Sequence, residues 1–142
     1  MSRSNSNILA IARCGRQFRD EAMVPLGLRG CHIGYLTRIC AEPGISQDAL
    51  AQNMLLNKSN IARQAAFLEE NGFITRTPSP TDKRLLQLYP TEKALALLPE
   101  MRDTVSQWDN ILFRDITDSE LETVTQLLEK MRRNAAQWME GR

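Results

Sequence analysis

The 142-residue sequence predicts a mainly α-helical fold that carries one small β-hairpin. Apolar residues recur at helical spacing before residue 72 and after residue 91. Between these regions, Phe73–Thr77 and Leu85–Tyr89 are two short strand candidates on either side of the segment PSPTDKR. Apolar residues make up 42% and charged residues 25% of the chain, which is ordinary for a globular domain.

Two helices are expected before residue 44. The first runs from Asn5 to about Leu26, and Pro25 with Gly27 closes it. The second is shorter and runs from Gly30 to Ala41, where Pro43-Gly44 follows. Both have an apolar face that must pack on another element.

The two central helices are the most informative part of the chain. Ser46 is expected to cap SQDALAQNM, and Asn57 is expected to cap NKSNIARQAAFLEEN. Met54–Leu56 is a short apolar break between them, and Gly72 is placed where a left-handed residue ends the second helix. Two short helices joined by a tight turn form a helix-turn-helix.

The second of these helices is expected to have a polar outer face. At helical spacing its apolar residues share one arc, whereas Ser59, Asn60, Arg63 and Gln64 lie on the opposite side and Lys58 lies near the N-terminal rim. Arginine, asparagine and glutamine read base edges, and serine and lysine bind phosphate. No acidic residue occurs between positions 49 and 68. A solvated helix face without a ligand is the alternative interpretation.

The hairpin that follows is expected to form a wing beside this helix. Pro78 and Pro80 stiffen its tip, because proline fixes φ and removes a donor. Lys83 and Arg84 supply charge suited to a narrow minor groove. Asp82 is expected to accept hydrogen bonds from Arg84 or from tip amides and so orient the basic group. The alternative is a solvated turn whose charges only prevent edge-strand aggregation.

The remaining chain is again helical, from Thr91 to about Arg114 and from a cap at Thr117-Asp118 onward. Its last helix has apolar residues on one stripe. Residues 100–129 hold eight acids and two bases, whereas residues 1–42 hold six bases and three acids. The complete order predicts a winged helix-turn-helix flanked by further helices, and the acidic end is expected to stay away from phosphates.

Other functional classes are disfavoured by what the sequence lacks. One histidine, no acid pair at a plausible spacing, no glycine-rich phosphate loop and no Ser-His-Asp set argue against an enzyme. The three cysteines have no metal-ligand spacing, so no metal or cofactor is expected, and reduced thiols fit a cytoplasmic protein. No segment is apolar and long enough to span a membrane. A winged helix used for protein contacts stays open as an alternative.

Residues Gly44–Ala94 resemble the MarR family of bacterial transcriptional regulators. The resemblance is carried by Leu68, by Glu69–Gly72, by Phe73–Arg76, by Asp82-Lys83-Arg84 and by Tyr89-Pro90-Thr91. Tyr89-Pro90 replaces the leucine usual before the threonine, and Ala94 stands where the family commonly has glycine. Outside this region the resemblance is one of helical layout.

The resemblance implies a homodimer that represses transcription from a pseudo-palindromic double-stranded DNA operator. Residues 1–29 and 95–142 would form the dimerisation helices, and residues 30–94 the DNA-binding lobe. The expected DNA-binding residues are Ser46, Asn57, Lys58, Ser59, Asn60, Arg63, Gln64, Arg76, Asp82, Lys83 and Arg84.

The resemblance also implies a response to a small effector, often an aromatic acid or phenol. Arg16, His32 and Tyr35 are the expected ligand residues, because a carboxylate or phenol needs a cation and polar partners in an apolar cleft. His32 as a helix-packing residue with a backbone partner and Tyr35 as core filling are the alternatives. Some relatives sense oxidants through a cysteine in the first helix, which makes Cys14 a second candidate, although a buried, inert Cys14 is favoured.

Overall fold

The computed structural model describes all 142 residues and begins with helix α1, Arg3–Met23. The 3-10 turn η1, Val24–Leu26, continues it to Gly27, whose φ of 79° is the left-handed conformation that glycine adopts without strain. The helix starts two residues before the expected Asn5, because the Ser2 side chain caps it by accepting from the backbone N–H of Asn5. The first predicted helix is therefore confirmed with a shifted start.

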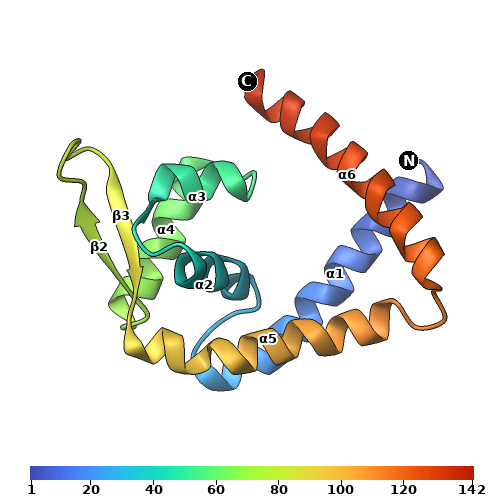
Figure 1. Cartoon of the computed structure of the whole chain (residues 1–142), viewed down its shortest axis with the longest axis horizontal. Coiled ribbons are helices and arrows are strands. Elements are labelled where there is room, and N and C mark those ends of the chain that lie inside the picture. The colour runs from blue at the N-terminus through green and yellow to red at the C-terminus, as the bar shows by residue number, and fades with distance from the viewer. The chain divides into compact units, whose positions relative to one another are not determined.

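Three helices make the central lobe: α2, Cys31–Ala41; α3, Gln47–Asn53; and α4, Lys58–Glu70 (Figure 1). The predicted caps are confirmed, since Ser46 accepts from the N–H of Ala49 and Asn57 accepts from the N–H of Asn60. Leu55 in the turn between α3 and α4 has a φ of 55°, which a leucine rarely adopts. This turn sets the angle between the two helices of the helix-turn-helix.

A three-stranded antiparallel sheet has the order β1-β3-β2. Its strands are β1, Ile45–Ser46; β2, Ile74–Pro78; and β3, Leu86–Pro90. Both hairpin strands begin one residue later than predicted, because the N–H of Phe73 donates to the Leu68 carbonyl at the end of α4 and the N–H of Leu85 donates to the Asp82 carbonyl in the wing tip. Strand β1 was not predicted. It pairs Ile45 with Leu88 and so joins the start of α3 to the wing.

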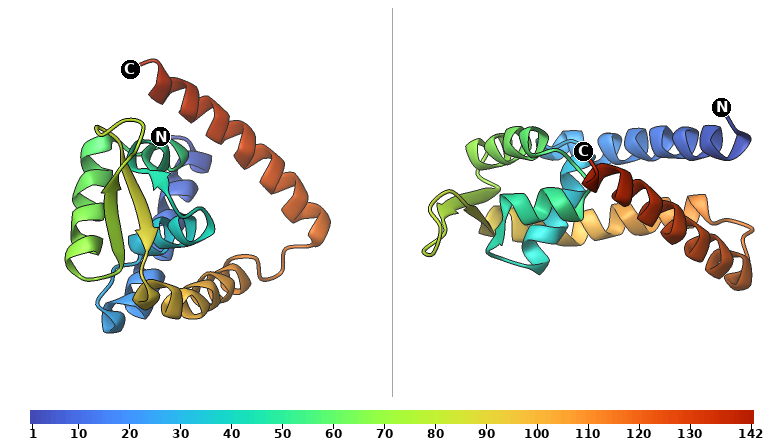
Figure 2. Two further views of the ribbon diagram at one scale, coloured as in Figure 1. Left: turned by 60° about the vertical axis from the view of Figure 1, so that its left-hand side comes forward. Right: turned by 90° about the horizontal axis from the view of Figure 1, so that it is seen from above.

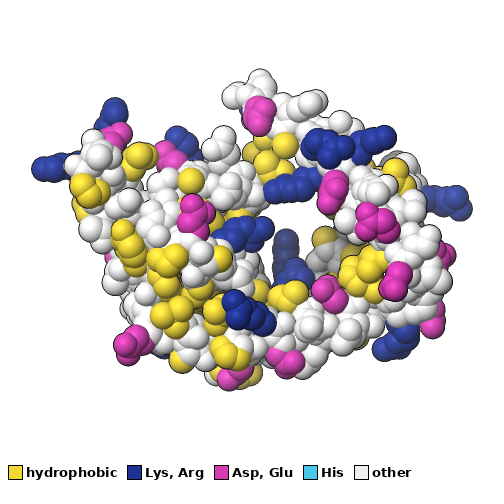
Figure 3. Space-filling view, viewed as in Figure 1, with side chains coloured by type: hydrophobic (Ala, Val, Ile, Leu, Met, Phe, Trp, Pro, Cys, Tyr) yellow, Lys and Arg dark blue, Asp and Glu magenta, His cyan; other side chains and the backbone are white.

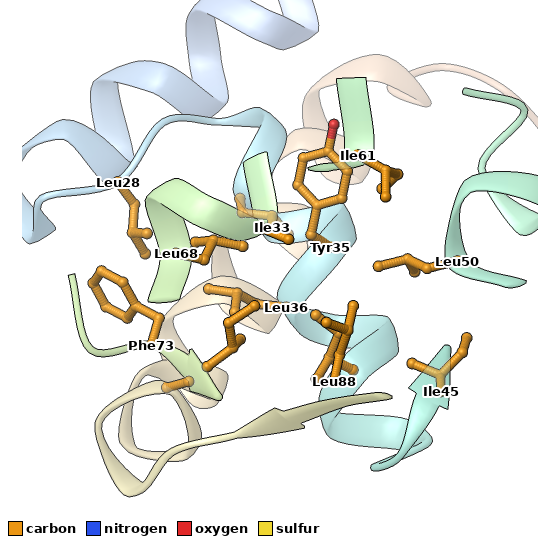
Figure 4. Close-up of a cluster of buried hydrophobic side chains, with 14 of the residues drawn as sticks. Leu28, Ile33, Tyr35, Leu36, Ile45, Leu50, Ile61, Leu68, Phe73 and Leu88 are labelled. Carbon is orange, nitrogen blue, oxygen red and sulfur yellow. The ribbon is translucent and has the colours of Figure 1, made fainter. Parts of the chain in front are cut away.

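The core of the lobe is an apolar cluster to which the elements from the end of α1 to α5 contribute. Phe73, Leu36 and Leu88 are almost completely buried in it. On α4 the buried side chains are Ile61, Ala65 and Leu68, as the helical periodicity predicted. Figure 4 shows Tyr35 beside Ile61 at the rim of the cluster, with its hydroxyl oxygen pointing away from the other core side chains.

Helix α5, Glu92–Leu112, follows β3 directly, and helix α6 covers Asp118–Glu140 (Figures 1 and 2). Residues 1–108 form one compact unit and residues 109–142 a second one. Within the first unit, the rings of Phe18 in α1 and Trp108 in α5 lie 5.4 Å apart. The predicted cap of α6 is confirmed as a capping box between Thr117 and Glu120, yet no residue of α6 is buried.

None of these helices combines the length and the hydropathy that crossing a bilayer requires.

Candidate nucleic-acid interface

The N-terminus of α4 is ordered by a side chain that precedes it. Asn57 Oδ1 accepts from the N–H of Asn60 at 2.7 Å and from the Ser59 hydroxyl at 2.8 Å. The amides of Lys58 and Ser59 stay at the helix end, where the dipole favours a phosphate oxygen. Lys58 Nζ lies 3.3 Å from Asp48 Oδ2, but both side chains are largely exposed, so this ion pair is weak.

The open face of α4 carries a short polar set of exposed side chains, Lys58, Ser59 and Arg63. Arg63 makes no ion pair, so its guanidinium is available to a ligand. The nearest acidic residue on the exposed arc is Glu70, at the far end of the helix. These three residues therefore form the exposed part of the predicted face, and Arg63 is the one among them without an ion pair or a hydrogen bond to another side chain.

Asn60 and Gln64 are placed differently from the prediction. Both are half-buried on the flank of α4 that faces α2. The Tyr35 hydroxyl donates to Asn60 Oδ1 at 3.4 Å, and Gln64 Oε1 lies 2.9 Å from His32 Nε2. The prediction set both residues opposite the buried face of α4. They lie instead at the edge of that face, where side chains of α2 contact them.

Arg76 joins the wing to α4 rather than standing free. Its guanidinium donates to Glu69 Oε1 at 3.1 Å, and its backbone N–H donates to Glu69 Oε2 at 2.9 Å. It also donates to Gln47 Oε1 in α3 at 3.4 Å. Only 22% of the Arg76 side chain is exposed. Sequence reasoning missed Glu69 and Gln47 as its partners. Half-buried Ser46 serves as the cap of α3.

The tip of the wing has the arrangement that was predicted for it. Asp82 accepts from the Arg84 backbone N–H, from Arg84 Nε at 3.1 Å and from Nη2 at 3.2 Å. These hydrogen bonds from the Arg84 side chain and backbone lower the pKa of Asp82. Lys83 and Arg84 are both exposed, and basic side chains stand at the outer end of the hairpin in Figure 3. A carboxylate therefore orients the basic group, as expected.

The three residues predicted to hold an effector do not come together. Tyr35 lines a cavity of about 480 Å³ between α1, α2, the turn before α4, and α5, but neither Arg16 nor His32 lines it. The cations there are Arg19 and Arg38, with Ile33, Met54, Leu56 and Val105 as apolar walls. Arg19 lies three residues after Arg16 on the same helix, so the phase of α1 decides which arginine reaches the cavity.

His32 has the backbone partner that the packing interpretation expected. Its ring is 1% exposed, and Nδ1 accepts from the Arg29 N–H at 2.9 Å. The ring stacks on Phe67 of α4 with centroids 4.9 Å apart. Burial lowers the pKa of His32 below its usual value of 6.5, although the hydrogen bond to Gln64 opposes the shift. Burial raises the pKa of the Tyr35 phenol, because it disfavours the charged phenolate just as it disfavours the charged imidazolium.

The cysteines differ in exposure from what was expected. Cys14 is exposed, so the expectation that it is buried is wrong. The reason is that α1 buries only Gly15 and Met23 within one chain. Cys31 is also exposed and Cys40 is half-buried, and burial raises the pKa of both thiols, which disfavours the reactive thiolate. Oxidant sensing by Cys14 stays a prediction.

The chain has a helix-turn-helix with an ordered wing, a basic exposed face on the second helix and a basic wing tip. These features define the class of winged-helix nucleic-acid-binding proteins. Known proteins agree with this class. The MarR family model matches residues 32–86. The HTH-type transcriptional regulator YybA of Bacillus subtilis (strain 168) is 34% identical over 70% of this chain and 67% of its own length. The chain belongs to the MarR family of transcriptional regulators.

Two further relatives support this. A protein of Thauera aromatica, named for transcriptional regulation of the hcr operon, is 33% identical over 83% of this chain and 71% of its own length. A MarR-family protein of Listeria monocytogenes, solved in complex with a 26mer DNA, superposes with a TM-score of 0.91. The two sequences are 27% identical, and the superposition covers 98% of this chain and 93% of the Listeria chain. The predicted family and fold are confirmed.

Proposed function

We propose that the chain is a sequence-specific repressor that binds a pseudo-palindromic operator as a homodimer and releases it in response to a small anionic or phenolic effector. The observation that carries the DNA-binding part is the exposed set Lys58, Ser59 and Arg63 on α4, in the same unit as a wing whose Arg84 is pre-oriented by Asp82. Arg63 would read a base edge, and Lys58, Asn57 and Ser59 would hold phosphates.

The remaining predicted DNA-binding residues support this surface from behind. Arg76 would hold the wing against α4 through Glu69, Ser46 would fix the start of α3, and Lys83 with Arg84 would enter the minor groove. Asn60 and Gln64 would contact DNA only with the amide atoms that α2 leaves free. Direct base readout is therefore concentrated on few side chains.

A homodimer is supported by apolar surface that one chain leaves open. In α6 the stripe of Val124, Leu127, Leu128 and Met131 is at least 41% exposed at every position. Ile8, Leu9 and Ile11 of α1 are exposed to a similar degree. An amphipathic helix with no buried residue needs a partner for its apolar face. Two-fold symmetry would place the two α4 helices in half-sites about 10 base pairs apart.

The cavity of about 480 Å³ supports an effector site. Arg19 and Arg38 would bind a carboxylate, the Tyr35 hydroxyl oxygen, whose proton is donated to Asn60, would accept from a phenol, and the apolar wall would take a ring. The cavity is formed by α1, α2 and α5 around the base of the helix-turn-helix, so a ligand there can change how α4 is held. Arg16 and His32 are not part of this proposal.

The test is selection of bound sequences from a pool of random duplexes, followed by titration at several salt concentrations. The expected result is a two-fold symmetric site bound by a dimer. Arg63→Ala should then lose about 1–3 kcal/mol of operator affinity and relax one base preference, whereas Arg84→Ala should weaken all sequences more evenly and lower the salt slope by about 1. Exposed Arg114 provides the control, and Arg114→Ala should change neither. Failure of a folded dimer to select any sequence would favour the protein-interaction alternative.

A further inference from the structure

We propose that His32 is a positioning residue for base recognition, which fixes the Gln64 side-chain amide with its NH₂ group toward the DNA. The proposal rests on the proposed function, because it assigns a polarity to one side chain of the DNA-binding helix. It explains why a fully buried imidazole with two specific partners lies beneath that helix.

The first step is the tautomer of His32. A neutral imidazole carries one N–H, and the other nitrogen is an acceptor. The Arg29 backbone N–H points at Nδ1 from 2.9 Å, and a backbone amide can only donate. Nδ1 must therefore be unprotonated, and the proton of the neutral ring is on Nε2.

The second step is the orientation of Gln64. The protonated Nε2 needs an acceptor, and the Gln64 atom at 2.9 Å is Oε1. An inverted amide would place NH₂ against N–H inside a site where the imidazole is only 1% exposed. Because a buried donor without an acceptor is costly, the inverted amide is excluded. Stacking on Phe67, at 4.9 Å and 10° between ring planes, prevents the imidazole from turning away.

The third step is what a fixed amide can recognise. A free glutamine pairs bidentately with adenine by accepting from N6 and donating to N7. With Oε1 held by His32, Gln64 can offer only its Nε2 hydrogens. These suit the acceptor-rich major-groove edge of guanine, with N7 and O6, and they lose the bidentate advantage at adenine. Gln64 is half-buried, so part of its side chain stays accessible, and its oxygen is the atom that His32 engages.

The experiment compares operator selection by the wild type, His32→Phe, His32→Gln and Cys40→Ser. A Gln64→Ala variant first identifies the operator position that Gln64 reads. In the wild type this position should prefer guanine over adenine. His32→Phe keeps a ring next to Phe67 but removes the donor, so Gln64 becomes free to turn and adenine preference should rise by ~tenfold or more. His32→Gln restores a side-chain donor near the Nε2 position and should retain most of the guanine preference.

Cys40→Ser is the control on the same helix, because Cys40 lies at the far end of α2 and belongs neither to the DNA-binding face nor to the cavity lining. It should leave the Gln64 position unchanged. Unaltered base preference in a folded His32→Phe protein, or a Gln64→Ala protein that reads every position like the wild type, would overturn the proposal while leaving the proposed function standing. Absence of any selected site with the wild type would instead reject the proposed function.

A second measurement does not depend on DNA binding. Nitrogen chemical shifts of the imidazole identify which ring nitrogen carries the proton, and His32 is the single histidine of the chain, so assignment is direct. The expected result at neutral pH is a protonated Nε2 and an unprotonated Nδ1. Protonation at Nδ1 would overturn the inference even if His32 variants altered DNA binding.

Discussion

Substitution of Glu69 by alanine tests the clamp that holds the wing to α4. The change removes the acceptor of three hydrogen bonds from Arg76, two from its guanidinium at 3.1 Å and one from its backbone N–H at 2.9 Å. The side chains of Arg76 and Glu69 are 22% and 38% exposed, so solvent screens the ion pair and it contributes less than about 1 kcal/mol. A half-buried backbone N–H without an acceptor adds about 1–3 kcal/mol. The expected loss in the free energy of unfolding is therefore about 2 kcal/mol.

The assay is urea unfolding at one fixed protein concentration, because pairing of chains would make stability concentration-dependent. The matched control is Glu70→Ala, which removes an exposed carboxylate on the next residue of the same helix. Its stability should change by less than about 0.5 kcal/mol. In a double-mutant cycle, Glu69→Ala and Arg76→Ala should couple by about 1 kcal/mol.

DNA affinity gives the sharper result, since both substitutions remove a negative charge from α4. Long-range electrostatics alone would strengthen DNA binding by either variant. A loosened wing should weaken it for Glu69→Ala only. Equal stability losses in the two variants, or tighter DNA binding by both, would refute the clamp.

Three further substitutions or conditions have definite expected outcomes. Asp82→Asn should weaken operator binding severalfold, because Arg84 loses the carboxylate that orients it, even though the change removes a negative charge. Unchanged or tighter binding in a titration would contradict this. Gly30→Ala should destabilise the fold by about 1–3 kcal/mol, since its Cβ would lie 2.6 Å from Arg19 Cβ. In the control Gly27→Ala the Cβ meets open space, so this variant should lose only about 1 kcal/mol through its left-handed φ, and equal unfolding midpoints of the two variants would rule out the clash. Burial lowers the pKa of His32 below 6.5, so the unfolded chain binds the proton more readily than the folded chain. The free energy of unfolding should therefore be level above pH 6.5 and fall as the pH drops from 6.5 toward the lowered pKa. His32→Gln should flatten this fall in urea unfolding between about pH 7.5 and about pH 5.5, and an equally steep fall in the variant would assign the pH dependence to other groups.

Features that depend on neighbouring residues could be predicted from the sequence. The caps at Ser46, Asn57 and Thr117 each bond to a backbone N–H three residues later, and Asp82 meets Arg84 two residues later. Side-chain type and spacing therefore contain enough information to place them. The helix order and the hairpin followed from periodicity for the same reason.

Features that join distant parts of the chain could not be predicted in this way. Strand β1 has two residues and exists only because Leu88 and Gln87 lie beside it. Arg76 meets Gln47 across 29 residues, and His32 meets Gln64 across 32. Such contacts depend on the angles between packed helices, which no local pattern specifies. This is why Arg76, Asn60 and Gln64 were chosen as contact residues without their internal partners.

Helix α6 bears on how long a single chain survives in a cell. None of its residues is buried within one chain, and a helix in a protein gains most of its stability by packing its amphipathic face. In a lone chain we expect this segment to open more readily than the packed lobe, and an open segment is where proteases cut. If pairing covers α6 as proposed, copies that have met another copy are protected and surplus copies are degraded first. The supply of active regulator would then be limited by encounter between chains rather than by synthesis alone.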